Sequence, residues 1–269
     1  MVSAIKLILD LPLWLVGVMV VGGAVALAFA LVFILHPVVK RRHGEEHNQV
    51  FSDGFAAVGT MYAIVAGLLV FGVFTTFEEA SAHSSNEATN LVLMYRDSGA
   101  FPQPVQSQAR EAITGYLTSV INDDWPALAE GKGSGKTSQA LDHLYKVYGP
   151  MNPDGSWSDQ YTNSVSQLDE VTKLRDQRIE NSAESLPGIY WFLLYAGAFI
   201  TILYLAMAYV GSRAMHAVAV GLMAAMLGLV IFLLLEVNHP FRGEIALSPD
   251  NFENALVTIS AINSGQWVQ

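Results

Sequence analysis

Four long stretches of the chain contain almost only apolar residues, and polar segments separate them. They cover residues 11–36, 54–77, 188–210 and 214–235. Because about 20 consecutive apolar residues cross the hydrocarbon core of a bilayer as an α-helix, this pattern predicts four transmembrane helices. The first stretch contains small residues that resemble a signal-peptide cleavage site, but its apolar run exceeds the roughly 7–15 residues of a signal core. We therefore interpret it as a span that is not cleaved.

The segment between the second and third apolar stretches, residues 78–186, is polar and has a helical period. Its apolar residues recur at spacings of three and four, namely Ala109, Ala112, Ile113, Tyr116, Leu117 and Val120, and again Tyr161, Val165, Leu168, Val171 and Leu174. We expect an all-α membrane protein with its four spans arranged as two hairpins and with three or four antiparallel helices in this insert. The expected limits are 1–77 and 187–236 for the hairpins, 78–186 for the insert and 237–269 for a C-terminal tail.

Composition agrees with a membrane protein and excludes several classes of function. Apolar residues make up 52% of the chain and charged residues 14%, against about 25% charged in an average soluble domain. The net charge is −10, and a nucleic-acid partner is not expected because the phosphate backbone would be repelled. Since the chain has no cysteine, disulfides, thiolate catalysis and cysteine-based metal centres are excluded.

The short loops between spans predict the orientation in the membrane. Lys40, Arg41 and Arg42 follow the first span, and Arg213 joins the third to the fourth. Basic short loops face the cytoplasm, so we expect a multi-pass protein of the plasma (inner) membrane with the insert and both termini outside. The insert agrees, because its eight basic and sixteen acidic side chains give it a net charge of −8.

One face of the second span carries an unbroken stripe at heptad spacing, small at its start and bulky at its end. Its members are Ala56, Thr60, Ala63, Gly67, Val70, Phe74 and Phe77. The first span has a shorter small-residue seam (Gly22, Ala26 and Ala30), and the fourth has another (Ala217, Gly221, Ala224 or Ala225, and Gly228). Such seams commonly allow close helix packing in lipid, and a tight four-helix bundle would explain all three. The alternative is a pore lined by several copies of the second span around an axis, with Thr60 and Gly67 among the candidate residues and with Val70, Phe74 and Phe77 forming a hydrophobic constriction that gates by dewetting.

Motifs that suggest catalysis lack the context that their chemistry needs. His43-Gly44-Glu45-Glu46-His47 fits the H-x-x-E-H pattern of zinc peptidases, but it lies in a 17-residue loop with no room for a substrate cleft. The segment Gly131–Thr137 ends like a phosphate-binding loop, yet Glu130 occupies the position where that pattern requires glycine, which favours a flexible connector.

Other ionisable groups also give no sign of an active site. Asp123-Asp124 and Asp142-His143 are expected on solvated faces. A haem site at His36 or His216 would need ligands from facing helices, and neither histidine has a spaced partner within its own helix. We expect no catalytic residues, no metal site and no cofactor. The span cores contain no Asp, Glu, Lys or Arg, which counts against a proton relay or a coupled transporter.

After the fourth span, Glu236, Pro240, Phe241 and Gly243 form a turn motif in which proline ends the helix and glycine permits a sharp bend. This turn, with the Ser248-Pro249 and Phe252 that follow it, resembles the closing motif of the bacterial bestrophin-like family. Further elements agree in order along the chain: Tyr62-Ala63, Glu87-Ala88, Tyr95-Arg96, Tyr116, Asp124-Trp125-Pro126, Arg178, Leu186-Pro187 and Trp191. Asn238 departs from the aspartate expected in the turn.

The resemblance implies a link to bestrophins, which are pentameric anion channels with a hydrophobic neck lined by the second span. It also implies a cytoplasmic insert, whereas the basic loops predict the opposite, and we follow the loops because orientation is set locally. The expected function is an oligomeric, non-enzymatic ion channel. The alternatives are a membrane scaffold or accessory subunit that binds a partner protein through the 78–186 insert and, with less support, a membrane enzyme that uses one of the loop motifs.

Overall fold

A computed structural model describes residues 11–42, 45–208 and 210–265 of the chain, without the side chains at 38 and 40–52. All regular structure within these residues is helical, which confirms the expected all-α class. The helices are α2 (Leu13–Arg42), α3 (Glu45–Asp97), η1 (Ser98–Ala100), α4 (Val105–Ser119), η2 (Val120–Asp124), α5 (Trp125–Leu128), α6 (Gly135–Tyr148), α7 (Ser158–Ala183), α8 (Gly188–Ala206), α9 (Arg213–Val237) and α10 (Asp250–Ser264).

Four of these helices are long and apolar enough to cross a membrane, as the hydropathy pattern predicts. The qualifying segments are Leu13–Pro37, Asp53–Ala100, Gly188–Ala206 and Arg213–Val237. The boundaries differ from expectation in several places. The segment expected as a loop between the first two spans is mostly helical, because α2 continues through Pro37 to Arg42 and α3 begins at Glu45. The third span ends at Ala206, four residues earlier than expected.

The chain divides into two compact units. The first contains the described residues up to Thr75, together with Ser185–Asn238 and Gly243–Ile245. The second contains Thr76–Glu184, His239–Arg242 and the described residues from Ala246 onward. The long helix α3 contributes its first part to one unit and its remainder to the other, so the helix does not end where its apolar stretch ends.

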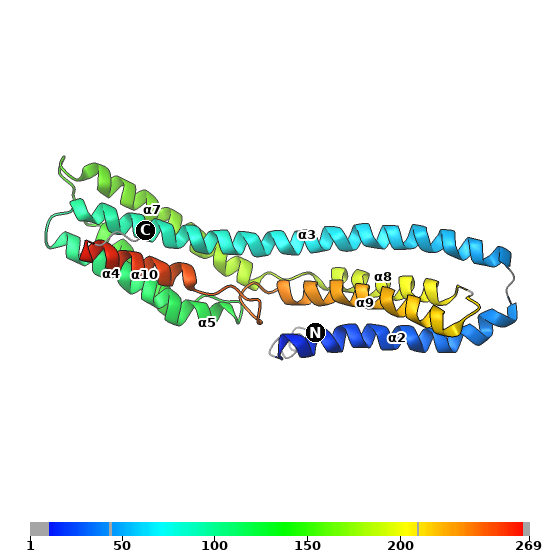
Figure 1. Cartoon of the computed structure of the whole chain (residues 1–269). Helices are drawn as coiled ribbons and strands as arrows, with labels where there is room; N and C mark the ends of the chain where they lie inside the picture. Colours follow the sequence, from blue (N-terminus) through cyan, green and yellow to red (C-terminus); the bar gives the residue numbers. More distant parts are fainter. Residues whose placement is uncertain (1–10, 43–44, 209, 266–269) are drawn as a thin grey trace. The chain divides into compact units, whose positions relative to one another are not determined.

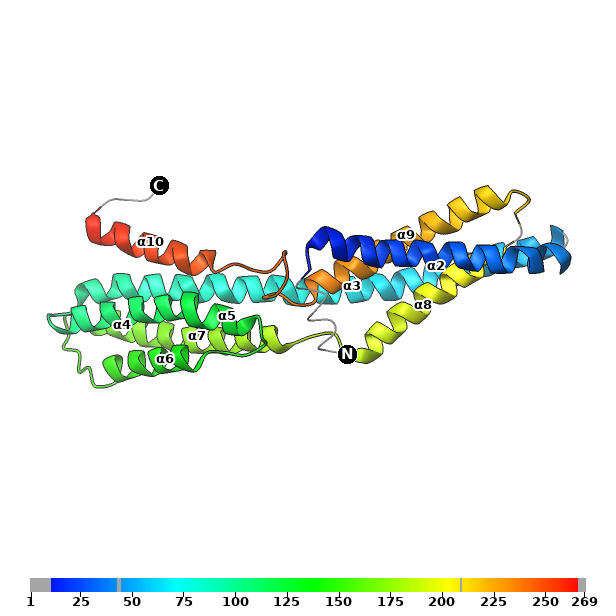
Figure 2. The same ribbon diagram turned by 90° about the horizontal axis from the view of Figure 1, so that it is seen from below.

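Within the first unit, α2 lies along α9, and α8 packs against both (Figures 1 and 2). The seam of the fourth span does pack as expected: a Cβ atom added at Gly228 would lie 3.0 Å from the Cα of Val21, and one at Gly221 would lie 2.8 Å from the ring of Phe29. The packing expected for the seam of the first span is wrong. Gly22, Ala26 and Ala30 are exposed in this unit, because α2 turns a different face, marked by Ala28 and Val32, toward α9.

In the second unit, the end of α3 packs together with α4, α6, α7 and α10 around one apolar core (Figure 2). The helical spacings found in the insert point to this core. Ala109, Ala112, Ile113, Tyr116, Leu117 and Val120 are all buried, as are Leu168, Val171 and Leu174. Helix α10 adds Phe252, Ala255 and Ile259 to the same core. The region expected only as a C-terminal tail is therefore an integral part of the second unit.

Candidate functional site

The stripe on α3 lies off the face that this helix buries in its own unit. Tyr62, Ala66 and Val73 are the buried side chains of its apolar part. The Tyr62 hydroxyl donates to the Leu194 carbonyl of α8 at 3.3 Å, and Gly197 of α8 leaves room for the Tyr62 ring. These contacts fix which face of α3 is turned inward.

The stripe residues are correspondingly accessible. Thr60, Gly67 and Phe74 are exposed, while Val70 and Phe77 are half-buried. The side chain of Phe74 is 52% exposed although it is a large aromatic group. The Thr60 hydroxyl donates to the Ala56 carbonyl at 2.7 Å, so it is satisfied within the helix. A single protomer thus presents this stripe instead of enclosing it.

An apolar groove of about 570 Å³ runs beside the first part of the stripe. Thr60, Gly67 and Val70 belong to its α3 wall, and Leu227 and Val230 belong to the opposite wall on α9. No charged side chain lines the groove.

The predicted turn motif, from Glu236 to Gly243, forms a sharp bend. Gly243 has φ +103°, a left-handed conformation that favours glycine, and a Cβ atom there would lie 3.4 Å from Oε2 of the buried Glu236. Pro240 and Phe241 are buried, and the Phe241 ring packs edge-on against Trp125 at 5.4 Å between centroids. Asn238, where the family resemblance leads us to expect aspartate, accepts a hydrogen bond from the Leu186 amide at 2.9 Å through its side-chain oxygen, a role that a carboxylate could also fill.

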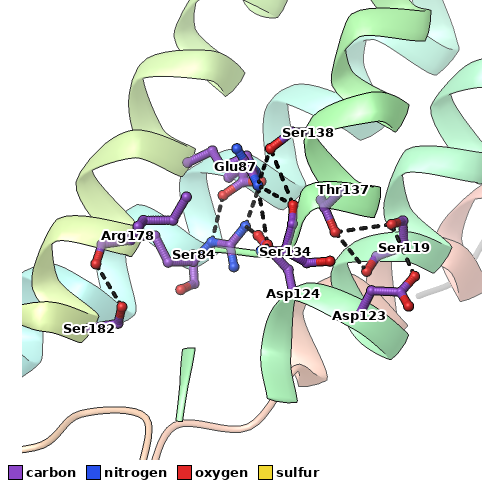
Figure 3. A network of polar contacts seen from close by, with 12 residues as sticks. Ser84, Glu87, Ser119, Asp123, Asp124, Ser134, Thr137, Ser138, Arg178 and Ser182 are labelled. Carbon is purple, nitrogen blue, oxygen red and sulfur yellow. Dashed lines mark hydrogen bonds and ion pairs between the residues drawn. The ribbon is translucent and has the colours of Figure 1, made fainter. Parts of the chain in front are cut away.

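The second unit contains a buried ion-pair network that we did not expect from the sequence (Figure 3). Arg178 of α7 and Glu87 of α3 have no exposed surface, and neither has Asp124 of η2. Nε of Arg178 lies 2.9 Å from Oε2 of Glu87, and its Nη2 lies 3.0 Å from Oδ2 of Asp124. Arg175, one turn earlier on α7, reaches Oδ1 of Asp124 at 3.2 Å. Two cations and two carboxylates therefore neutralise each other inside the unit.

A neighbouring hydroxyl group adds a further hydrogen bond to the network. The Tyr116 hydroxyl donates to Glu87 at 2.7 Å, and burial followed by the Glu87 charge raises the pKa of Tyr116 well above its usual value. Burial is the largest single effect and disfavours the charged form of Arg178, but Glu87, Tyr116 and Asp124 together outweigh it and raise the pKa of Arg178. The arginine is thus permanently charged, and the network is a structural clamp among α3, α4, η2 and α7.

The segment Gly131–Thr137 contributes a backbone hydrogen bond to this network. The backbone N–H of Ser134 donates to Asp124 at 2.7 Å, and the Ser134 side chain caps α6. A Cβ atom at Gly133 would lie 2.6 Å from the Ile179 side chain. The expectation of a flexible connector is therefore wrong for Gly133 and Ser134, which are held in close contacts. The solvated position expected for Asp124 is also wrong, because this carboxylate is fully buried and accepts the hydrogen bond from Ser134.

Sequence reasoning missed the network although one signal was present. The apolar series Leu168, Val171 and Leu174 continues at helical spacing to Arg178, so this arginine lies on the buried face of its helix. Asp142 and His143 are exposed as expected. The histidines and the glutamate of the H-x-x-E-H pattern fall outside the residues whose side chains are described, and among the described residues no group of three or more His, Cys, Asp or Glu could hold a metal ion.

Four apolar helices of spanning length and a helical unit with an internal ion-pair network define a polytopic helical membrane protein. The model of the bestrophin-like domain matches residues 22–252, which is most of the chain. The chain therefore belongs to the bestrophin-like family, as the resemblance predicts. A search of curated proteins finds no match.

Solved structures with a similar fold include bacterial bestrophin homologues. A tryptophan-to-alanine variant of a homologue from Klebsiella pneumoniae has a TM-score of 0.72 and 15% identity, covering 91% of this chain and 97% of that one. A leucine-to-threonine variant from the same organism has a TM-score of 0.70 and 14% identity, covering 91% and 99%. A structure described as a membrane protein has a TM-score of 0.69 and 14% identity, again covering 91% and 99%. At this identity the likeness establishes the fold.

Proposed function

We propose that this protein is an oligomeric ion channel with a pore lined by α3, the second span. The observation that carries the proposal is the position of the α3 stripe. Most of its residues lie outside the packed core of the protomer, in which α3 buries Tyr62, Ala66 and Val73, and Val70 alone packs against the edge of that core. Around a symmetry axis, copies of the stripe would enclose a path without any titratable side chain, wide at Thr60 and Gly67 and narrow at Val70, Phe74 and Phe77. A ring of large apolar side chains can gate by dewetting.

The proposed arrangement places the four spans in two hairpins, with limits 1–77 and 187–236, and keeps the helical 78–186 insert outside the membrane. The tail from 237 returns through the Glu236-to-Gly243 turn toward the insert. The assembly is a homo-oligomer, a pentamer on the bestrophin resemblance, and it has no enzymatic role. It lies in the plasma (inner) membrane with the insert and both termini outside the cytoplasm, because Arg41, Arg42 and Arg213 follow the positive-inside rule.

Conductance in planar bilayers tests the constriction. Phe74→Ala and Phe77→Ala should each raise the open-channel current or the open probability, because a smaller side chain widens the ring and wets it more readily. Leu68→Ala is the matched control, since Leu68 is an apolar side chain of α3 that is 67% exposed but lies off the stripe. Equal effects of all three substitutions, or none, would exclude a constriction at Phe74 and Phe77.

The native mass of the detergent-purified protein tests the assembly. A closed ring of identical chains supports the pore. A monomer, or one copy bound within a different complex, would exclude the central pore and favour the alternative, a scaffold or accessory subunit that binds a partner through the insert. In that case truncating the insert should abolish the partner interaction, while Phe74→Ala should change stability only.

A further inference from the structure

Two histidines that are far apart in the sequence meet where the end of α2 packs against the start of α9. The ring centroids of His36 and His216 lie 6.5 Å apart, with the ring planes tilted by 45°. His216 is only 2% exposed. Val32 and Val220, one helical turn away on the same two helices, are fully buried in the apolar core. The pair therefore lies at the edge of the apolar core, with His216 buried and His36 half-buried.

A hydrogen bond fixes the proton position on His216. Its Nε2 lies 3.0 Å from the carbonyl oxygen of Leu205. A carbonyl only accepts hydrogen bonds, so Nε2 carries the proton, and in the neutral ring the lone pair is on Nδ1. Ligand histidines in metal sites are commonly oriented in this way, with the second ring nitrogen donating to a backbone carbonyl.

Both histidines also have a buried ring nitrogen without a hydrogen-bond partner among the described residues. These atoms are Nδ1 of His216 and Nε2 of His36. A buried polar atom that is left unsatisfied costs about 1–3 kcal/mol, and native structures seldom contain one without an ion, a water molecule or a functional reason. Two such atoms at one contact point to a shared ligand.

We propose that His36 and His216 bind one divalent transition-metal ion of the zinc type between α2 and α9, through Nε2 of His36 and Nδ1 of His216. Imidazole nitrogen suits zinc, copper and nickel, whereas magnesium and calcium prefer oxygen ligands. Two zinc–nitrogen bonds of about 2.0–2.1 Å at a tetrahedral angle hold the ring centres roughly 5 Å apart, so the two rings move closer together when the ion binds. Solvent completes the coordination, and the ion ties the first span to the fourth.

The test measures zinc bound to the full-length protein in detergent after equilibration with zinc sulfate and removal of free metal. The wild type should retain one equivalent per chain. His216→Gln keeps an N–H donor for the Leu205 carbonyl but lacks the Nδ1 lone pair, so it should lose the zinc. His36→Gln should lose it as well. His143→Gln, at an exposed position of α6, is the control and should retain it.

A double variant separates this site from the H-x-x-E-H pattern. His43→Gln with His47→Gln should keep the zinc equivalent if His36 and His216 hold the metal. As a second readout, zinc but not magnesium should raise the thermal unfolding midpoint of the wild type by several degrees, because a ligand that binds only the folded state stabilises it. This rise should be absent in His36→Gln. The side chain of His36 is half-buried, so its substitution disturbs folding less than substitution of the buried His216.

The site is overturned if the wild type retains no zinc, or if the double variant loses the zinc while His36→Gln and His216→Gln keep it.

Discussion

Arg178 is held inside the second unit by two carboxylates that come from different helices. The desolvation cost of such a buried charge is offset only because Glu87 and Asp124 contact it directly and Tyr116 satisfies one remaining oxygen. The apolar spacing along α7 could have indicated that Arg178 is buried, but it could not indicate its partners. Those partners are 91 and 54 residues away in the sequence, and only tertiary packing brings them together.

The first prediction concerns Arg178→Met. This change leaves the buried Glu87 without a cation and Asp124 with Arg175 alone, and it should lower the free energy of unfolding by about 3–5 kcal/mol. Denaturant titration in detergent measures the loss. Lys173→Met removes a cation from the exposed pair with Glu170 and should cause no measurable change, because exposed ion pairs contribute little. A loss below about 1 kcal/mol for Arg178→Met would show that the network is not a clamp.

The helices themselves were largely predictable, because apolar length and helical period depend on local sequence. The four spans and the two apolar series of the insert are examples. Two features were not predictable in this way. Packing partners depend on which faces meet, so the seam of the first span was assigned to the wrong face. Helix α10 was missed although Phe252, Ala255 and Ile259 recur at spacings of three and four, because the tail was interpreted only through its turn.

A glycine substitution tests the contact between α3 and α8. Gly197→Ala would place a methyl group against the Tyr62 ring, and the ring cannot move away without losing its hydrogen bond to Leu194. We expect a loss of about 1–3 kcal/mol from overpacking. Gly22→Ala is the control, since nothing lies within 4 Å of the added atom. A thermal unfolding midpoint that falls equally in both variants would mean that helix propensity, and not this contact, decides the outcome.

At the scale of the whole molecule, the resemblance to the family rests on many weak motifs in a shared order. The predicted orientation in the membrane rests instead on a few basic residues in short loops. These two sources predict opposite sides for the insert. The absence of cysteine from the chain makes the question directly measurable, because any thiol that is introduced is the only one in the protein.

Single-cysteine variants should therefore report the orientation in intact cells. Lys146→Cys lies at an exposed position of the insert, and a membrane-impermeant thiol reagent should label it from outside. Gly211→Cys lies in the short connection before α9, where nothing crowds an added side chain, and it should react only after the membrane is permeabilised. The reverse pattern would place the insert in the cytoplasm and contradict the positive-inside assignment.

The π-helical segment η2 (Val120–Asp124) has a consequence for how the chain tolerates insertions and deletions. Such a segment holds one residue more than an α-helix would need for the same turn. Deleting one residue between 120 and 123 would restore a regular helix from α4 into α5, and local helix propensity would favour the change. Because the extra residue is accommodated within one turn, the residues on either side keep about the same angle about the helix axis, and Asp124 would still face Arg175 and Arg178. The chain should therefore tolerate a one-residue deletion here, although the segment lies next to a buried ion-pair network.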